Sequence, residues 1–172
     1  MPSMRLVKAE GEASWQQAST ILFEVVKRMD AKNRSFWTAE QVSVSSLREA
    51  YELSQLYWLQ LDDELAGLVF LMDMDTYYWP EKTDRTSLFF HKLAIRPAYT
   101  GLGLGAAALA EIRQFARRNG YAHVRLDCRD REPLHQFYAG NGFSLVDVKP
   151  LGGRKVARYE LPVNHPQVVK NP

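Results

Sequence analysis

The chain has 172 residues, of which 46% are hydrophobic and 24% are charged, a balance that suits one domain with an apolar core. The net charge is only +2 and the basic residues are scattered, so nucleic acid is not an expected partner. Cys128 is the only cysteine, which excludes an internal disulfide and a cysteine-based metal cluster. No segment resembles a signal peptide or a membrane span, so we expect a cytoplasmic protein without a membrane partner.

The first half of the chain predicts two helices and a hairpin. Apolar residues recur at helical spacing from Glu12 to about Asn33, and Thr38–Gln41 forms a capping-box pattern that begins a second helix through about Tyr51. Asp62–Glu64 separates two apolar runs and is typical of a hairpin turn. In the second run, Gly67 would let another backbone come close or would allow a bulge. The strands expected here are 5–9, 56–61 and 65–72.

The segment after the hairpin, Asp73–Glu81, mixes aromatic and acidic residues without a regular period. Three aromatic rings beside several carboxylates would form a pocket wall for a cationic amine, through ring faces and charge complementarity. A surface loop anchored by its aromatic residues fits the same pattern equally well. Both interpretations therefore stay open from the sequence.

A glycine-rich loop between a strand and a helix predicts an anion site. The apolar run Leu88–Ile95 leads through an Arg-Pro turn to Gly101–Ala106, and a helix is expected over Leu104–Asn119 with Gly120 as its stop. Alternate glycines remove side chains where a ligand approaches the main chain, and the unpaired amides of the first helical turn point at that ligand. A phosphate or pyrophosphate would fit there.

The last third predicts a strand, a short helix and a closing hairpin. The strand covers Ala122–Cys128, and Pro133 suits an early position of a short helix that Gly140 and Gly142 end. An antiparallel pair, 142–148 and 154–163, is expected to close the sheet.

Two motifs together resemble the GNAT superfamily of N-acetyltransferases. The order of strand, Pro-containing turn, Gly-x-Gly-x-Gly and helix is similar to that family's acyl-CoA pyrophosphate loop, although Thr100 stands where the family usually has Arg or Gln. Downstream, Val124–Cys128 and Phe137–Phe143 resemble the family's strand and its Phe-Tyr-x-x-x-Gly-Phe helix end. Arg131 occupies the position where many members have Asn, and the resemblance covers about 65–163.

The resemblance implies one GNAT-like domain over residues 1–172, with a cofactor-binding core at about 86–145. The implied fold is α/β (α+β): a mixed, largely antiparallel sheet, helices on both faces and a splayed central strand pair. Acetyl-CoA is the implied cosubstrate. No metal is expected, because the four histidines are not at ligand spacing. The residues expected to contact acetyl-CoA are Leu93, Ala94, Ile95, Thr100, Gly101, Leu102, Gly103, Leu104, Gly105, Ala106, Arg131 and Phe137.

Acetyl transfer from a thioester requires a neutral amine, a donor to the developing oxyanion and a proton for the leaving thiolate. By resemblance, a backbone amide within Leu93–Ile95 serves the oxyanion, and Tyr138 stands beside the sulfur as the general acid. Two residues are candidates for the general base. His91 has an unperturbed pKa of about 6.5, which suits that role. Asp127, on a neighbouring strand, fits a base, an orienting group or a cation-binding group.

The expected acceptor is a primary amine, with a tilt toward a small cationic metabolite. A protein amino group is an alternative acceptor, and a non-catalytic acyl-CoA-binding module is an alternative class. Residues 33–51 and 73–84 are the segments that would choose the acceptor, and Phe36 and Trp37 there are either substrate contacts or packing residues. A homodimer is expected only from its frequency in the family.

A dinucleotide site is the remaining alternative for the glycine loop, with Asp127 as the ribose-binding acid. In that fold the first glycine follows the strand directly, whereas Arg96–Thr100 intervenes here. The chain after Asp127 is also too short for the remaining crossovers. The sequence therefore favours an acyl-CoA site.

Overall fold

The computed structural model describes residues 3–32, 34 and 36–164. The chain divides into two compact units, each built from two separate stretches. Unit 1 comprises Met1–Leu71 and Phe90–Glu111, and unit 2 comprises Met72–Phe89 and Ile112–Pro172. Within the described ranges, no helix combines the length and the apolar character needed to cross a bilayer. That the two units belong to one domain stays a prediction.

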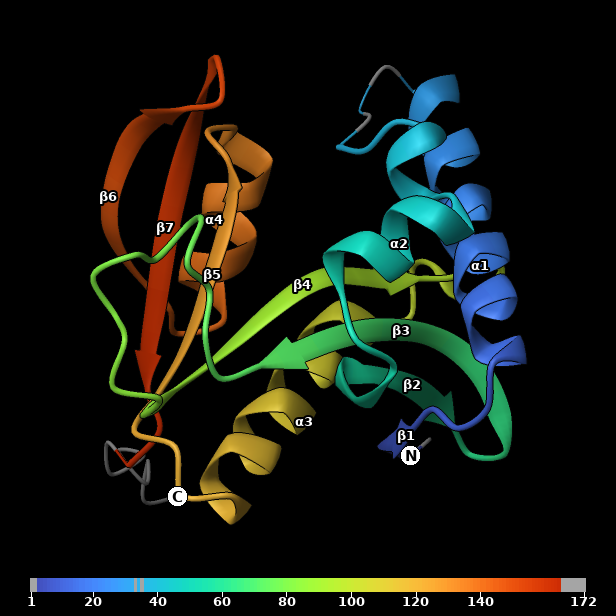
Figure 1. Ribbon diagram of the computed structural model, residues 1–172, viewed down its shortest axis with the longest axis horizontal. Helices are drawn as coiled ribbons and strands as arrows, with labels where there is room; N and C mark the ends of the chain where they lie inside the picture. Colours follow the sequence, from blue (N-terminus) through green and yellow to red (C-terminus); the bar gives the residue numbers. More distant parts are fainter. Residues whose placement is uncertain (1–2, 33, 35, 165–172) are drawn as a thin grey trace. The chain divides into compact units, whose positions relative to one another are not determined.

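Unit 1 contains an antiparallel sheet and two helices (Figure 1). Its strands are β1 (Met4–Lys8), β2 (Leu56–Leu61) and β3 (Glu64–Met72), joined in that order by antiparallel pairing, with β4 next in the sheet. Helix α1 (Ala13–Ala31) buries one face, as its apolar spacing predicts, and α2 (Val44–Ala50) lies against it. The expected end of the first helix, Asn33, lies outside the described residues. The buried residues of α1 are Ser14, Trp15, Ala18, Ile21, Leu22, Val25 and Val26.

The second predicted helix is shorter than the sequence indicated. The capping box forms as expected, because Thr38 and Gln41 exchange hydrogen bonds of 3.0 and 3.2 Å. It opens only a 3-10 turn, η1 (Glu40–Val42), before the chain becomes extended at Ser43, with φ −65° and ψ 156°. The Ser43 hydroxyl then accepts a hydrogen bond from the Ser46 amide and caps α2. A second local cap therefore divides the segment that the sequence treats as one helix.

Gly67 in β3 allows the close backbone approach that the sequence anticipated. A Cβ atom built at Gly67 would lie 2.1 Å from the carbonyl oxygen of Ala94, far inside van der Waals contact. The neighbouring Arg96 amide donates to the Ala66 carbonyl at 2.8 Å. The absence of a side chain at this position thus brings β3 and the last residues of β4 together.

Unit 2 contains the rest of the sheet and the short helix α4 (Glu132–Gly140). Strand β4 (Ser87–Ile95) pairs in parallel with β5 (His123–Arg129), but only over Ser87–Phe89, although both strands continue further. Strand β5 then pairs antiparallel with β7 (Arg154–Pro162), and β7 with β6 (Ser144–Leu151). The predicted mixed, largely antiparallel sheet is confirmed.

Strand β6 differs in detail from the sequence prediction, whereas helix α3 follows it closely. Strand β6 runs to Leu151 and includes Pro150, whereas the prediction ended at Val148. Proline is tolerated there because β6 is the edge strand next to β7 in the sheet that the described residues form. Helix α3 (Leu104–Arg118) begins at the predicted residue and is followed by Gly120 at φ 77°. Its residues belong partly to unit 1 and partly to unit 2.

Candidate active site

The glycine loop of unit 1 leaves its main chain open. Gly101 and Gly103 adopt φ angles of 82° and 72°, in the left-handed region that other residues adopt at a cost. A Cβ atom at either glycine would meet nothing within 4 Å, so a side chain there would fill the space above the loop. Because α3 begins at Leu104, the first-turn amides of that helix belong to the same loop. The arrangement fits an anionic ligand.

Thr100 is turned back toward the chain. Its hydroxyl donates to the carbonyl oxygen of Pro97 at 2.9 Å and closes the 3-10 turn η3 (Pro97–Tyr99). The Arg or Gln that the family usually carries at this position would extend a donor toward a phosphate. The hydroxyl hydrogen of Thr100 is used within the turn, so the loop offers backbone donors in place of that side chain.

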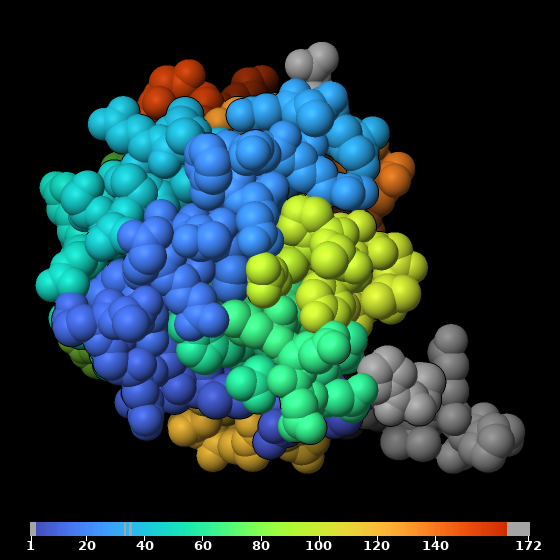
Figure 2. All heavy atoms as spheres, turned by 90° about the vertical axis from the view of Figure 1, so that its right-hand side faces the viewer, coloured from blue at the N-terminus to red at the C-terminus, as the bar shows by residue number. Residues whose placement is uncertain are grey.

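Two acidic side chains of unit 1 anchor the start of this loop. Arg96 donates from Nε and Nη2 to both carboxylate oxygens of Glu24 on α1, at 3.1 and 2.9 Å. The Tyr99 hydroxyl donates to Glu64 at 2.6 Å. Figure 2 shows the resulting position, with the yellow-green residues around 95–103 at the surface beside the blue residues of α1. Contacts across more than 30 residues of sequence thus hold the turn that presents the glycines.

The predicted oxyanion segment, Leu93–Ile95, forms the end of β4. Ala94 is buried opposite Gly67, and Leu93 and Ile95 are half-buried. The preceding residue, Lys92, has a φ of 56°, which is uncommon for a side chain other than glycine and marks an irregularity inside the strand. The direction of the next peptide group therefore departs from regular strand geometry.

His91, on the same strand, is held by a tyrosine that sequence reasoning missed. Its Nδ1 lies 3.0 Å from the Tyr51 hydroxyl, and the two rings meet edge to face. The Tyr51 ring in turn stacks on Phe70 at a centroid distance of 4.1 Å. Lys92 Nζ lies 5.2 Å from the ring centroid of Trp37. Trp37, which the sequence leaves as either a substrate contact or a packing residue, thus has a cation beside its ring. The Tyr51 hydroxyl therefore fixes the position of the His91 ring on β4.

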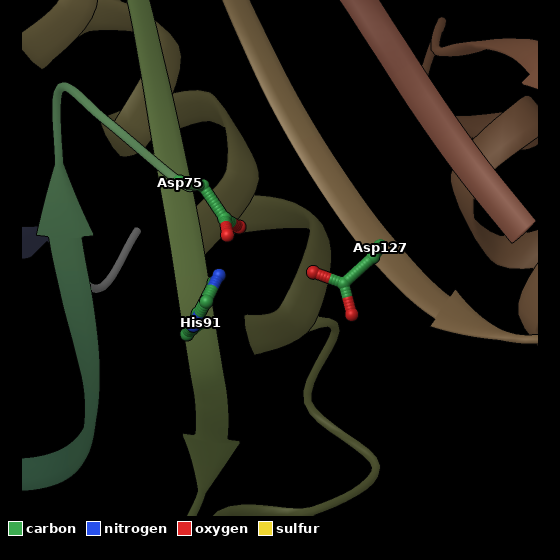
Figure 3. Close-up of side chains that lie close together, drawn as sticks. All are labelled: Asp75, His91 and Asp127. Carbon is green, nitrogen blue, oxygen red and sulfur yellow. The ribbon is translucent and has the colours of Figure 1, made fainter. Parts of the chain in front are cut away.

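Asp127 has a second carboxylate beside it in unit 2. A carboxylate oxygen of Asp75 lies within 4.8 Å of one of Asp127. Figure 3 shows that Asp75 comes from the chain after β3 and Asp127 from β5; it also draws His91, on β4. Asp75 is buried, and its Oδ1 accepts from the Tyr78 amide at 3.0 Å. Two neighbouring carboxylates favour a cation, either an ammonium group or a hard metal ion.

Tyr78 adds a phenol to this acidic group. Burial and then the Asp127 carboxylate raise the pKa of Tyr78, while Arg154, which shares a hydrogen bond with it, acts in the opposite direction. The neighbouring Tyr77 is exposed and meets the Tyr78 ring edge to face at 4.8 Å. Of the 73–81 segment, Asp75 and Tyr78 are therefore the residues near Asp127, whereas Trp79 packs against the guanidinium groups of Arg125 and Arg158. That the segment forms a pocket wall stays a prediction.

Tyr138 is buried in an aromatic cluster at the end of α4. Its ring centroid lies 5.1 Å from Phe137, 5.9 Å from Phe143 and 5.7 Å from Tyr159. Burial, followed by the nearby Cys128 and Asp127, raises the pKa of Tyr138 above its ordinary value. The phenol therefore keeps its proton at neutral pH, which is the state a general acid needs.

The remaining unit 2 residues have structural contacts of their own. Arg131 is the N-cap of α4 and is half-buried. His135 lies between Asp130, at 2.6 Å from Nε2, and the hydroxyl of Tyr159 at its Nδ1. The pKa of Cys128 is raised to about 12 by burial and then by Asp127 and Asp130, so its thiol is neutral at physiological pH. A nucleophilic role for Cys128 is disfavoured on that ground.

The predicted site residues thus fall into two groups. The strand and loop residues, 91, 93–95 and 100–106, belong to unit 1, and Asp127, Arg131, Phe137 and Tyr138 belong to unit 2. Residues 22–143, most of the chain, match the family model described as the Acetyltransferase (GNAT) family. The chain belongs to this family. The glycine loop, β5 up to Arg129 and the helix that carries Tyr138 all lie inside the matched range.

Individual relatives support the same family and fold. The uncharacterized N-acetyltransferase YesJ of Bacillus subtilis (strain 168) is 26% identical over 114 residues, which are 63% of this chain, and the match spans 63% of that relative's length. A GNAT acetyltransferase of Listeria monocytogenes has the same fold, with a TM-score of 0.72, 16% identity and 94% of both chains covered. The Salmonella typhimurium protein yncA, solved with its cofactor acetyl-CoA, gives a TM-score of 0.65 at 15% identity, covering 96% of this GNAT chain and 95% of its own.

Proposed function

We propose that this protein is an N-acetyltransferase that moves the acetyl group of acetyl-CoA directly to the primary amine of a small cationic molecule. The observation that carries the proposal is the glycine loop, with Gly101 and Gly103 at positive φ and open space above them, in a chain of the GNAT family. Backbone amides of this loop and of the first turn of α3 would bind the pyrophosphate of the cosubstrate. The Arg or Gln side chain that the family usually has at the position of Thr100 would not take part.

In the proposed reaction the amine nitrogen attacks the thioester carbonyl carbon. A carbon–nitrogen bond forms, the carbon–sulfur bond breaks, and the sulfur leaves with a proton from Tyr138. A backbone amide within Leu93–Ile95 donates to the oxyanion, a position that follows the irregularity at Lys92. Either His91 or Asp127 accepts the proton that the amine loses, and the hydrogen bond between Tyr51 and His91 is a local observation in favour of the histidine.

The acidic group of unit 2 supports a cationic acceptor. Asp75 and Asp127 lie close together and Tyr78 adds a ring beside them, so the positive charge of an ammonium group would be stabilised there. A neutral amine would gain nothing from this charge. We therefore propose a small molecule that carries at least one further positive charge besides the reacting amine.

Thermal unfolding with and without acetyl-CoA tests the cosubstrate. At a hundred times its dissociation constant, acetyl-CoA should add about 2.7 kcal/mol to the free energy of unfolding and raise the melting temperature, whereas NAD and ATP should not. Release of the CoA thiol, followed with a chromogenic disulfide, then tests turnover with small amines of different charge. Protection by NAD alone contradicts the family-based site. Protection by acetyl-CoA without turnover of any amine or peptide amino terminus would identify a binding module instead.

A further inference from the structure

We propose that Arg158 is a positioning residue that sets the preference for a cationic acceptor. Its guanidinium group holds residues 73–86, the segment between β3 and β4 called here the 73–86 loop, against β7. That contact keeps Asp75 and Tyr78 beside Asp127. The inference rests on the proposed function for its link to catalysis, and on unit 2 alone for its geometry.

Arg158 makes more contacts than an ordinary surface ion pair. Its side chain is 7% exposed, and Nε and Nη2 form a fork with the two carboxylate oxygens of Asp147 on β6, at 2.8 and 2.7 Å. Its Nη1 donates to Glu81 at 2.5 Å and to the carbonyl oxygen of Tyr78 at 3.1 Å. The first pair belongs to the sheet and the second to the 73–86 loop, so one guanidinium group joins the two.

Trp79 completes the attachment of the loop. The residue is 1% exposed, and the Arg158 guanidinium carbon lies 4.3 Å from the ring centroid, with that of Arg125 at 5.6 Å. Among the described residues the indole N–H has no hydrogen-bond partner. Packing and the two cations, rather than a hydrogen bond from the ring, therefore hold Trp79 in place.

The hold on Tyr78 and Trp79 extends to Asp75 through short local bonds. The Tyr78 amide donates to the Asp75 carboxylate at 3.0 Å, and the Trp79 amide donates to the Asp75 carbonyl oxygen at 2.9 Å. Arg158 also stands directly opposite Asp127 in the β5–β7 register, which puts the two side chains on one face of the sheet. Displacing the loop from Arg158 would thus move Asp75 away from Asp127.

Substitutions of the two carboxylates that Arg158 contacts test whether its hold on the 73–86 loop, rather than its general contribution to the fold, sets the acceptor preference. Glu81→Gln removes the carboxylate on the loop side of Arg158, and Asp147→Asn removes the one on the sheet side. Arg158→Lys keeps the positive charge and loses the fork, so it serves as a third variant that leaves a cation beside Glu81 and Asp147. In each variant, trypsin cleavage after Lys82 and Arg85 measures the hold on the loop. The Michaelis constants for 1,5-diaminopentane and 5-amino-1-pentanol measure the preference for a second charge.

We expect Glu81→Gln and Arg158→Lys to speed cleavage in the 73–86 loop about tenfold and to raise KM for 1,5-diaminopentane about tenfold. The KM for the aminoalcohol, kcat and the dissociation constant of acetyl-CoA should stay within about twofold of the wild-type values. Asp147→Asn should leave both readouts within about twofold, because the loop-side bonds remain.

Equal effects of Glu81→Gln and Asp147→Asn, or none from Glu81→Gln, would overturn the proposal. A wild-type protein that acetylates neither amine would instead overturn the cationic acceptor of the proposed function. In that case the cleavage rates alone still decide whether Arg158 holds the loop. The two failures are therefore distinguishable.

Discussion

Tyr138 illustrates how one residue's surroundings select its chemistry. The ring is enclosed by Phe137, Phe143 and Tyr159, and burial raises the pKa of its phenol. Because its pKa is raised, the phenol stays protonated at neutral pH and has a proton to donate to the departing thiolate. The same enclosure means that removing the hydroxyl leaves most of the packing intact.

We therefore expect Tyr138→Phe to lower kcat about a hundredfold while the dissociation constant of acetyl-CoA stays within about twofold. Single-turnover thiol release and calorimetric titration of acetyl-CoA measure the two quantities. Tyr159→Phe is the matched control, because Tyr159 is also buried and its ring lies next to Tyr138. An equal loss of kcat in both variants would argue for a packing effect and against a general acid.

The site residues that sequence reasoning overlooked share one property, which is that their partners are distant in the chain. Tyr51 meets His91 across 40 residues, and Arg158 meets Glu81 across 77. A local motif carries the glycine loop and Tyr138, so both could be proposed from spacing alone. Nothing in the residues around Arg158 indicates that its guanidinium group reaches another part of the chain.

At the scale of elements, the sequence predicted helix bounds well where one local signal, such as apolar spacing or a glycine stop, was present without a competing one. The periodic apolar face of α1 and the glycine stop after α3 appear as predicted. Residues 38–50 contain two competing caps, Thr38 and Ser43, and the second one ended the helical run that the first had begun. Sequence reasoning had no measure of which cap would prevail.

The close approach at Gly67 makes a quantitative prediction for the β3–β4 contact. Gly67→Ala places a Cβ atom 2.1 Å from the Ala94 carbonyl oxygen, and a backbone atom yields less readily than a side chain. We expect a loss of about 3 kcal/mol in the free energy of unfolding, or roughly 6–12 °C in melting temperature. Urea denaturation and thermal scans measure both.

Gly140→Ala is the matched control for that substitution. Gly140 lies at the end of α4, has an ordinary φ, and would have nothing within 4 Å of an added Cβ atom, so alanine there should be neutral or slightly stabilising. If the two variants had the same stability, the backbone approach at Gly67 would not be a constraint on the fold.

Across the whole molecule, partial or full burial raises the pKa of several phenol and thiol groups. Burial is the first cause of the raised pKa at Tyr57, Tyr78, Tyr138 and Tyr159, and it raises the pKa of Cys128 from 9.0 to about 12. On the acid side the opposite holds for Asp147, whose pKa is lowered by the hydrogen bond from Arg158. Stability that depends on Asp147 is present at neutral pH and is lost as the pH falls.

The alkaline side gives the sharper prediction. Each group with a raised pKa stays protonated in the folded chain after the unfolded chain has released its proton, so its stabilising contribution is complete below the unfolded pKa and is lost as the pH rises. We expect the free energy of unfolding to fall from about pH 9 upward, by up to about 1.4 kcal/mol per pH unit for each such proton. Denaturation at pH 7.5, 9 and 10.5 measures this slope.

Cys128→Ala, which has no thiol to ionise, should flatten the slope between pH 9 and about 12, the interval between the pKa values of the thiol in the unfolded and the folded chain. An unchanged slope in that variant would mean that the thiol is no more protonated in the folded chain than in the unfolded one.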